Sequence, residues 1–480
     1  MRRRAGPLLV LAAAVAGCTV VGPNYERPTV DSPPAWRIDY AQSADVANTL
    51  WWRQFDDPVL DGLIEQALRD NRDLRIAAAR IDQFIGQLGS TRAQFYPQVG
   101  YGADASRNRA SEATLPPGSD LYSSLYSGAL SASWQIDLFG RVQRQSEAAQ
   151  AQVYASEQGR RGVVLSLASS VAASYVLLRG LDRQLEIAQA TERNYADTRD
   201  IFAKRFRGGV VSQVEVQQVE SQYRQAQAAI PSLEQQVAAL ENLISTLLGG
   251  NPGPIPRGKT IDALGMPPVP GALPSSLLER RPDVLQAEQT LVAANANVGV
   301  AQSLYYPTIS LTGVLGLSSA ALGDFLGSAA ATGSLAAGLT GPIFTFGAIE
   351  GQVASAEAAQ RLALASYQQV VLQAFRETND ALVGTEKGRQ AAAAQSRRVA
   401  ALREYARLSK LKFDNGYAGY LEVLYAQNEL FVSELAAVQS QVEAYTQLIA
   451  VYKAMGGGWV DQAALLAPAP MSAASGTAKN

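Results

Sequence analysis

The stretch FYPQV at Phe95–Val99 returns about 210 positions later as YYPTI at Tyr305–Ile309. After each copy, the spacing of apolar residues changes from the period of a helix to the period of a strand. Other segments repeat in the same order: LFGR at Leu138–Arg141 returns as TFGA at Thr345–Ala348, and FRGG at Phe206–Gly209 returns as FDNG at Phe413–Gly416. The chain therefore consists of two similar halves, and each half should form a similar set of helices and strands.

Composition excludes several classes of protein. The 480 residues are 47% hydrophobic and 18% charged, which argues against a disordered tail protein. The net charge is −2 and the only basic run is Arg2–Arg4, so nothing indicates nucleic-acid binding. With no histidine and one cysteine, the chain lacks the residues for zinc sites, histidine general-base catalysis, structural disulfides and a Cys–His nucleophile. We find no catalytic motif, and we expect no enzyme, no cofactor and no metal site.

The first residues are typical of a bacterial lipoprotein signal. Arg2–Arg4 precede an apolar stretch of about nine residues, which is too short to span a bilayer. The stretch ends in VAGC at Val15–Cys18, which predicts a signal peptide at 1–17 and lipidation of Cys18, the only cysteine. A signal anchor with an incidental cysteine is the alternative. Thr19 stands where an aspartate commonly retains lipoproteins at the inner membrane, so the outer membrane of a Gram-negative bacterium is favoured.

The mature chain divides by composition and periodicity into five parts. They are an extended N-terminal arm without a core of its own at 18–57, a first repeat at 58–250, a Pro/Gly linker at 251–274, a second repeat at 275–456 and a flexible tail at 457–480. Asp57 followed by Pro58 predicts the start of the first helix, as an N-cap with proline in the first turn.

Each repeat contains two segments with the period of a strand. They lie at about 98–107 and 123–136 in the first repeat and at about 308–318 and 332–344 in the second. In the clearest case, Tyr126, Leu130 and Trp134 alternate with small polar residues. The length suits a tilted transmembrane strand, and a small uncharged polar face suits a water-filled lumen; a half-buried strand of a soluble sheet is the alternative. Four strands cannot close a barrel, so copies of the chain must supply the others.

Very long helices follow the strands. No proline interrupts 141–205 or 348–412, and each segment ends in a glycine turn followed by a returning helix, which gives helical hairpins at 141–248 and 348–455. Helices of this length imply coiled-coil or helical-barrel packing. The predicted fold class is therefore an internally duplicated combination of a membrane β-barrel and a long α-helical barrel.

Several motifs resemble one family. CTVVGPNYERP at Cys18–Pro28, Trp51-Trp52, RRPD at Arg280–Asp283, the repeated Tyr-Pro and Phe-Gly motifs, and YKAMGGGW at Tyr452–Trp459 are similar to the outer-membrane factor family of TolC- and OprM-like exit ducts, in its NodT-type lipoprotein branch. The resemblance covers essentially the whole mature chain. It implies a homotrimer with one twelve-stranded barrel in outer-membrane lipid and a periplasmic helical tunnel. The implied partners are a periplasmic adaptor (membrane fusion) protein and an inner-membrane transporter.

The resemblance also implies a gate at the second hairpin. Glu422 falls where one branch of the family has an aperture aspartate, and Tyr425 replaces a second aspartate. A ring of Glu422 side chains would attract cations, while the alternative role is a favourable interaction with the helix dipole. Tyr417 and Tyr420 are candidates for hydrogen bonds that hold the hairpin closed, although packing is an equal alternative, and Glu215 is the first-repeat counterpart of Glu422.

The hairpin tips are the candidate contacts with the adaptor. These residues are Arg207, Gly208, Gly209, Asp414, Asn415 and Gly416. A plain solvent-exposed turn is the alternative there. The predicted function is a trimeric outer-membrane exit duct of a tripartite efflux pump that passes small molecules such as drugs or toxic compounds. The alternative function is a structural or adhesive coiled-coil lipoprotein, which would not need a barrel with a polar lining.

Overall fold

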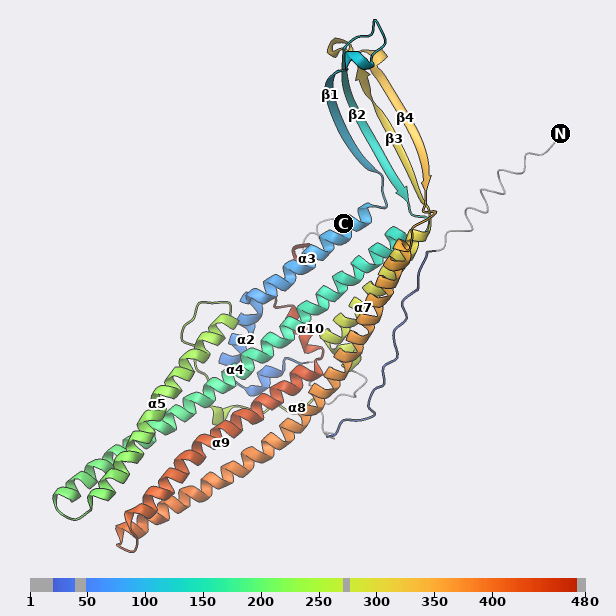
Figure 1. Cartoon of the computed structure of the whole chain (residues 1–480). Helices are drawn as coiled ribbons and strands as arrows, with labels where there is room; N and C mark the ends of the chain where they lie inside the picture. The colour runs from blue at the N-terminus through green and yellow to red at the C-terminus, as the bar shows by residue number, and fades with distance from the viewer. Residues whose placement is uncertain (1–19, 39–48, 271–276, 473–480) are drawn as a thin grey trace. The chain divides into compact units, whose positions relative to one another are not determined.

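A computed structural model describes residues 20–38, 49–270 and 277–472 (Figure 1). The signal peptide and Cys18, for which the sequence predicts lipidation, lie outside these residues. The chain forms two compact units, which we describe separately. The first unit comprises residues up to Thr29, Ile81–Ser156 and Ala287–Tyr367, and the second comprises Val30–Arg80, Glu157–Gln286 and Gln368 onward.

The sheet of the first unit has four antiparallel strands in chain order (Figure 1). The strands are β1 Gln98–Arg109, β2 Tyr122–Ile136, β3 Thr308–Ser319 and β4 Ala331–Thr340. The first three begin and end within two residues of the predicted segments. β4 was expected to reach residue 344, but it ends at Thr340. Gly341 and Pro342 follow, and Pro342 has no N–H to continue the hydrogen-bonded ladder.

The register of the sheet separates an apolar face from a polar one. Leu130 lies opposite Leu315, and the pair Ser133 and Thr312, three positions further along, belongs to the other face. The apolar face carries Val99, Tyr101, Leu130, Trp134, Leu311, Leu315, Leu335 and Leu339. Its large side chains are uncovered in the single chain, with Leu315 73% and Leu335 88% exposed. Such a surface requires an apolar environment.

The helices and 3-10 helices lie along the chain as follows: η2 Trp51–Phe55, α2 Pro58–Asp70, α3 Arg72–Ala93, η3 Glu112–Thr114, α4 Arg141–Arg207, α5 Gln213–Leu247, η4 Ile261–Ala263, α6 Leu277–Arg280, α7 Pro282–Gln302, η6 Ser303–Tyr305, η7 Leu322–Asp324, η8 Ser328–Ala330, α8 Ala348–Asp414, α9 Tyr420–Met455 and α10 Trp459–Ala464. α2 begins as the sequence predicts, because the Asp57 carboxylate accepts a hydrogen bond from the Val59 amide at 2.9 Å. Asn71 ends α2 and caps α3, accepting from the Asp73 amide at 2.8 Å.

Two pairs of helices form long hairpins. α4 and α8 have 67 residues each, which corresponds to about 100 Å of helix. α5 and α9 return along them, and α5 continues as one helix through Pro231. Of the described helices, only α4 has an apolar stretch long enough to cross a membrane, and more than half of that stretch is buried inside the protein. Burial against other helices accounts for its apolar composition.

Aromatic residues from both ends of the chain form a cluster in the second unit. Trp51 stacks on Tyr452 with ring centroids 5.0 Å apart, and Trp459 meets the Trp51 ring edge-on at 6.0 Å. Trp51, Trp52, Phe55 and Trp459 have no exposed surface. The 18–57 arm was expected to lack a core and the segment from 457 to be flexible. The structure corrects both expectations locally, because the η2 rings pack against Tyr445 and Tyr452 of α9 and the α10 ring packs against η2.

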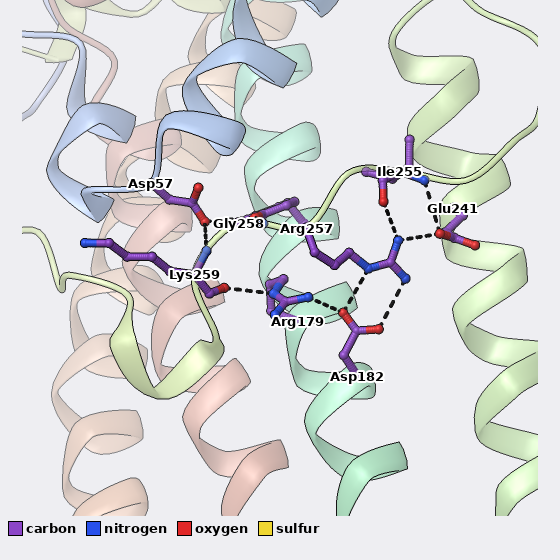
Figure 2. A network of polar contacts seen from close by, with 9 residues as sticks. Asp57, Arg179, Asp182, Glu241, Ile255, Arg257, Gly258 and Lys259 are labelled. Atoms are coloured by element: carbon purple, nitrogen blue, oxygen red, sulfur yellow. Dashed lines mark hydrogen bonds and ion pairs between the residues drawn. The ribbon is translucent and has the colours of Figure 1, made fainter.

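Polar contacts hold the linker that follows α5 (Figure 2). The Arg257 guanidinium donates to both oxygens of Asp182 on α4, at 3.0 and 3.2 Å, and also pairs with Glu241 on α5. Two residues further on, the Lys259 amide donates to Asp57 at 2.9 Å and its carbonyl accepts from Arg179 at 2.8 Å. The linker therefore connects the start of α2 with α4 and α5.

Candidate functional site

The two hairpin turns have the same local geometry. Gly209 and Gly416 take positive φ values of 72° and 78°, which glycine adopts without steric cost. In the first turn the Val210 amide donates to the Arg205 carbonyl at 2.9 Å, and in the second the Tyr417 amide donates to Lys412 at 2.9 Å. These bonds satisfy carbonyls at the helix ends. All six predicted tip residues, Arg207, Gly208, Gly209, Asp414, Asn415 and Gly416, are exposed.

The helices that leave the turns are capped differently. In the first hairpin, Ser212 and Glu215 form a capping box, because the Glu215 amide donates to the Ser212 hydroxyl and the Ser212 amide donates to the Glu215 carboxylate at 2.8 Å. In the second hairpin the N-cap residue is Gly419, which has no side chain to cap the helix. Glu215 therefore has a local structural role, while its counterpart Glu422 is free to bind elsewhere.

Glu422 binds across the second hairpin to the helix that precedes the turn. Its carboxylate lies 3.3 Å from the Lys412 ammonium and accepts from the Ser409 hydroxyl at 3.4 Å. The side chain of Glu422 is 34% exposed. The charge is thus partly compensated within the chain, and it also lies in the first turn of α9, where a carboxylate favours the helix dipole. The role of Glu422 at an aperture stays a prediction.

Tyr420 belongs to an aromatic cluster that joins the two hairpins. Its ring lies 4.2 Å from the Phe202 ring on α4 and 4.9 Å from the Phe413 ring on α8. The Arg205 guanidinium lies over both phenylalanine rings, 5.9 and 5.6 Å from their centroids. Burial raises the pKa of the Tyr420 phenol. The buried core around Tyr420 consists of Tyr195, Phe202, Val219, Tyr223, Ala226, Val423 and Leu424.

The other two tyrosine candidates are exposed. Tyr417 is 85% exposed and Tyr425 is 59% exposed. The structure therefore brings Tyr420 and Glu422 into contacts with neighbouring helices and leaves the other two tyrosines uncovered. Sequence reasoning missed Phe202 and Arg205. Phe202 lies four residues before the repeated FRGG turn, so its position one helical turn from the hairpin tip was the available signal.

The RRPD motif holds the start of α7 against the end of α9. Arg281 is 5% exposed, donates to the Ala454 carbonyl at 2.9 Å and pairs with Glu377 on α8 at 2.8 Å. Burial opposes the charge of Glu377, but the hydrogen bond from Arg281 outweighs it and lowers the pKa of this carboxyl. Arg281 is thus a structural residue that connects three helices.

No group of three potential metal ligands occurs among the described residues. The candidate site is therefore a pair of packed helical hairpins, with candidate residues in the hairpin turns and in the first turns of the helices that follow. Such an arrangement offers exposed turns to a binding partner, and we identify no catalytic constellation among the residues that the structure describes.

Comparisons with known proteins agree with this description. The family model described as "Outer membrane efflux protein" matches residues 63–250 and 273–457. The solvent efflux pump outer membrane protein SrpC of Pseudomonas putida is 31% identical over 467 residues, covering 96% of this chain and 99% of that protein. The cation efflux system protein CusC of Escherichia coli O6:H1 is 31% identical over 458 residues, covering 94% of this chain and 97% of that protein.

Solved structures show the same fold. The open state of the MtrE outer membrane channel of Neisseria gonorrhoeae gives a TM-score of 0.84 at 31% identity, covering 92% of this chain and 99% of that chain. The outer-membrane channel OprN gives a TM-score of 0.81 at 30% identity, with coverage of 92% and 99%. The predicted fold class, with four strands and long helices in a duplicated chain, is confirmed.

Proposed function

The chain belongs to the outer membrane efflux protein family, and we propose that three copies of it form the exit duct of a tripartite efflux pump. The observation that carries the proposal is the four-stranded sheet, which has one exposed apolar face, one small polar face and two open edges. Lipid can cover the apolar face, and water can fill the side that the polar face lines. Open edges are not tolerated in hydrocarbon, so neighbouring copies must pair with them, and three copies give twelve strands.

A lipid anchor at Cys18 is consistent with the contacts that residues 21–24 make with α4. The Arg144 guanidinium on α4 donates to the carbonyls of Val21 and Gly22, each at 3.1 Å, and to the Asn24 side chain at 2.9 Å. Arg144 is 5% exposed, so this contact fixes the chain shortly after Cys18 to the unit that contains the strands. Acyl chains on Cys18 would then enter the same membrane as the barrel.

The hairpin tips and Glu422 have proposed roles in partner binding and gating. The exposed turns at Arg207–Gly209 and Asp414–Gly416 would contact a periplasmic adaptor, through which an inner-membrane transporter delivers the cargo. Glu422 side chains of three copies would form a ring of negative charge at the periplasmic aperture. Because relatives are named for solvents and for cations, we propose small molecules as the cargo class.

The first experiment is planar-bilayer conductance of the purified lipidated protein, with the oligomeric mass measured on the same preparation. A trimer that gives discrete conductance steps is the expected result. A monomer that stays silent, even when the second hairpin is loosened by Tyr420→Ala, would overturn the duct. That outcome would favour the structural lipoprotein.

A further inference from the structure

The two loops that close the β-hairpins differ in composition. The β1–β2 loop, residues 110–121, carries two acidic residues, Glu112 and Asp120. The β3–β4 loop, residues 320–330, reads AALGDFLGSAA, and Asp324 is its only charged residue. Both loops lie at the end of the sheet away from the Tyr-Pro motifs. The second loop is therefore apolar where the first is hydrophilic.

Hydrogen bonds within the β3–β4 loop give it a defined shape. The Asp324 amide donates to the Ala321 carbonyl at 3.2 Å, and the Gly327 amide donates to the Asp324 carbonyl at 3.0 Å. The Ser319 hydroxyl, at the end of β3, donates to the Ala321 carbonyl at 2.8 Å. Successive turns of this kind satisfy backbone groups internally, which a segment in contact with lipid requires.

Phe325 places this loop on the apolar face of the sheet. Gly128 on β2 belongs to the same face as Tyr126 and Leu130, because residues two positions apart on a strand share a face. A Cβ at Gly128 would meet Cζ of Phe325 at 3.2 Å, so the ring occupies the space above this glycine. The ring is half-buried there. The loop therefore folds toward the apolar face and not over the polar one.

The leucines beside Phe325 are uncovered in the single chain. Leu322 is 66% exposed and Leu326 is 84% exposed. Leu322 lies three residues before Phe325, at the start of the 3-10 helix η7, and side chains at this spacing lie on the same side of such a helix. Together with the exposed Leu315 on β3, these side chains extend the apolar face of the sheet into the loop.

The length of β2 places the loop at one boundary of the apolar band. Tyr126 and Trp134 lie on the apolar face near the two ends of β2. The strand between them is about 27 Å long, and at a tilt of 35–45° it rises about 20 Å. Transmembrane barrels have an apolar band of about 25 Å with aromatic residues at both boundaries. Gly128 lies close to Tyr126, so the Phe325 ring lies near the outer boundary.

We propose that the β3–β4 loop is an interfacial membrane anchor, in which Leu322, Phe325 and Leu326 insert between acyl chains of the outer leaflet beside the barrel wall. This inference rests on the proposed duct, because it needs the apolar face to lie in lipid, and it adds a lipid contact outside the strands. Asp324 then lies at the level of the lipid headgroups, where its carboxylate stays hydrated.

The position of the Phe325 ring favours lipid over the other possible occupants. A loop directed into the lumen would lie on the polar face, whereas the ring lies over Gly128 on the apolar face. A second copy of the chain would meet the sheet at its edges, but β2 is an inner strand between β1 and β3. The loop surface is also continuous with a face that the membrane covers, and it offers almost no charge to a protein partner.

An environment-sensitive nitrobenzoxadiazole probe on Leu326→Cys tests the anchor in the full-length protein. The labelled protein is reconstituted into phosphatidylcholine vesicles that contain lipid with a doxyl quencher near the headgroup or near the chain end. Cys18 is the only native cysteine, and the native chain treated in parallel measures background labelling. The hydrophilic control is Ala113→Cys, an exposed position in the β1–β2 loop. The control in the hydrocarbon is Leu335→Cys, on the apolar face of β4 and 88% exposed.

The expected result is that the shallow doxyl lipid quenches the probe at 326 more than the deep one does. Iodide on both sides of the membrane should quench it severalfold less than the probe at 113. Iodide quenching as strong as at 113 would overturn the anchor and leave the duct intact. Protection from both iodide and doxyl lipid would also overturn it, in favour of a contact between copies. If lipid fails to quench the probe at 335, the barrel and the anchor are both wrong.

Two further variants test the seat of the Phe325 ring. Gly128→Val fills the space that the ring occupies, and Phe325→Ser removes the ring without changing the strand. Each should increase iodide quenching of the probe at 326. The matched control is Gly102→Val, because a Cβ at Gly102 would meet no heavy atom within 4 Å. Unchanged quenching in Phe325→Ser, or an equal increase in Gly102→Val, would overturn the role of the ring.

Discussion

Replacing Tyr420 by alanine should loosen the start of α9 from the first hairpin. Tyr420 is 7% exposed and packs between Phe202 and Phe413 at centroid distances of 4.2 and 4.9 Å. Truncating a buried aromatic side chain costs about 3–5 kcal/mol. We assume that Tyr420 makes this contact in the closed state and loses it when the start of α9 opens locally. The alanine variant then lowers the free energy of opening by about 3 kcal/mol, which makes the open population roughly a hundredfold larger than in the native chain.

Tyr420→Phe separates packing from hydrogen bonding. The phenylalanine keeps the ring between its two neighbours and removes the hydroxyl that bonds the Thr198 side chain. A neutral hydrogen bond contributes about 1 kcal/mol, so the open population should rise only about fivefold. The alanine variant should therefore differ from the phenylalanine variant by more than a factor of ten in the open population.

Native-state hydrogen exchange of the amides in the first turns of α9 measures this opening directly. Tyr425→Ala is the matched control, because Tyr425 lies on the same helix and is 59% exposed. Faster amide exchange in Tyr420→Ala but not in Tyr425→Ala is the expected result. If Tyr425→Ala accelerates exchange as much as Tyr420→Ala, or if Tyr420→Ala changes nothing, the cluster does not hold the hairpin and the reasoning fails.

Three further outcomes are expected. Glu422→Gln should reduce the cation preference of the channel in bilayer recordings. The control is Glu404→Gln, which replaces an exposed carboxylate on α8 and should leave the cation preference unchanged. An equal reduction by both variants would argue for a general effect of charge. Trp459→Ala should cost about 3–5 kcal/mol and lower the melting temperature, while Leu465→Ala, which is 85% exposed, should leave it unchanged. The pKa of Glu377 is lowered in the folded protein, so its stabilising contribution is present above the unfolded value of about 4.3 and is lost as the pH falls through the folded pKa. Glu377→Gln should therefore flatten the acid side of a melting-temperature profile, and an unchanged profile would contradict that role.

Local patterns predicted much of this architecture because they depend on neighbouring residues. The period-2 alternation located the strands, since a sheet with one apolar face fixes which residues alternate. The ends of the long helices follow from glycine turns at Gly209 and Gly416, which the sequence shows directly. The duplication also helped where the alternation of apolar and polar residues is unclear, because the equivalent segment of the other repeat shows it more clearly. The strand that begins at Gln98 is an example.

The contacts that sequence reasoning missed join residues far apart in the chain. Trp51 and Trp459 each stand in a short segment without helical periodicity, and only the folded chain brings their rings together. Similarly, the spacing in the second hairpin placed Glu422 in the first helical turn but could not show that Lys412 lies beside it. β4 was predicted too long because the alternation continues to Ile343, although Pro342 ends the hydrogen bonding within one chain.

The aromatic cluster makes the folding of this chain depend on its last part. Trp51 and Trp52 are made early, but the ring of Trp459 that covers them is made only after nearly all of the 480 residues. A chain that stops before Trp459 lacks one of the rings that pack against Trp51 and Trp52, so part of their surface would be exposed. Exposed hydrophobic surface of this kind promotes aggregation. We therefore expect a chain truncated before Trp459 to aggregate more readily than the full-length chain.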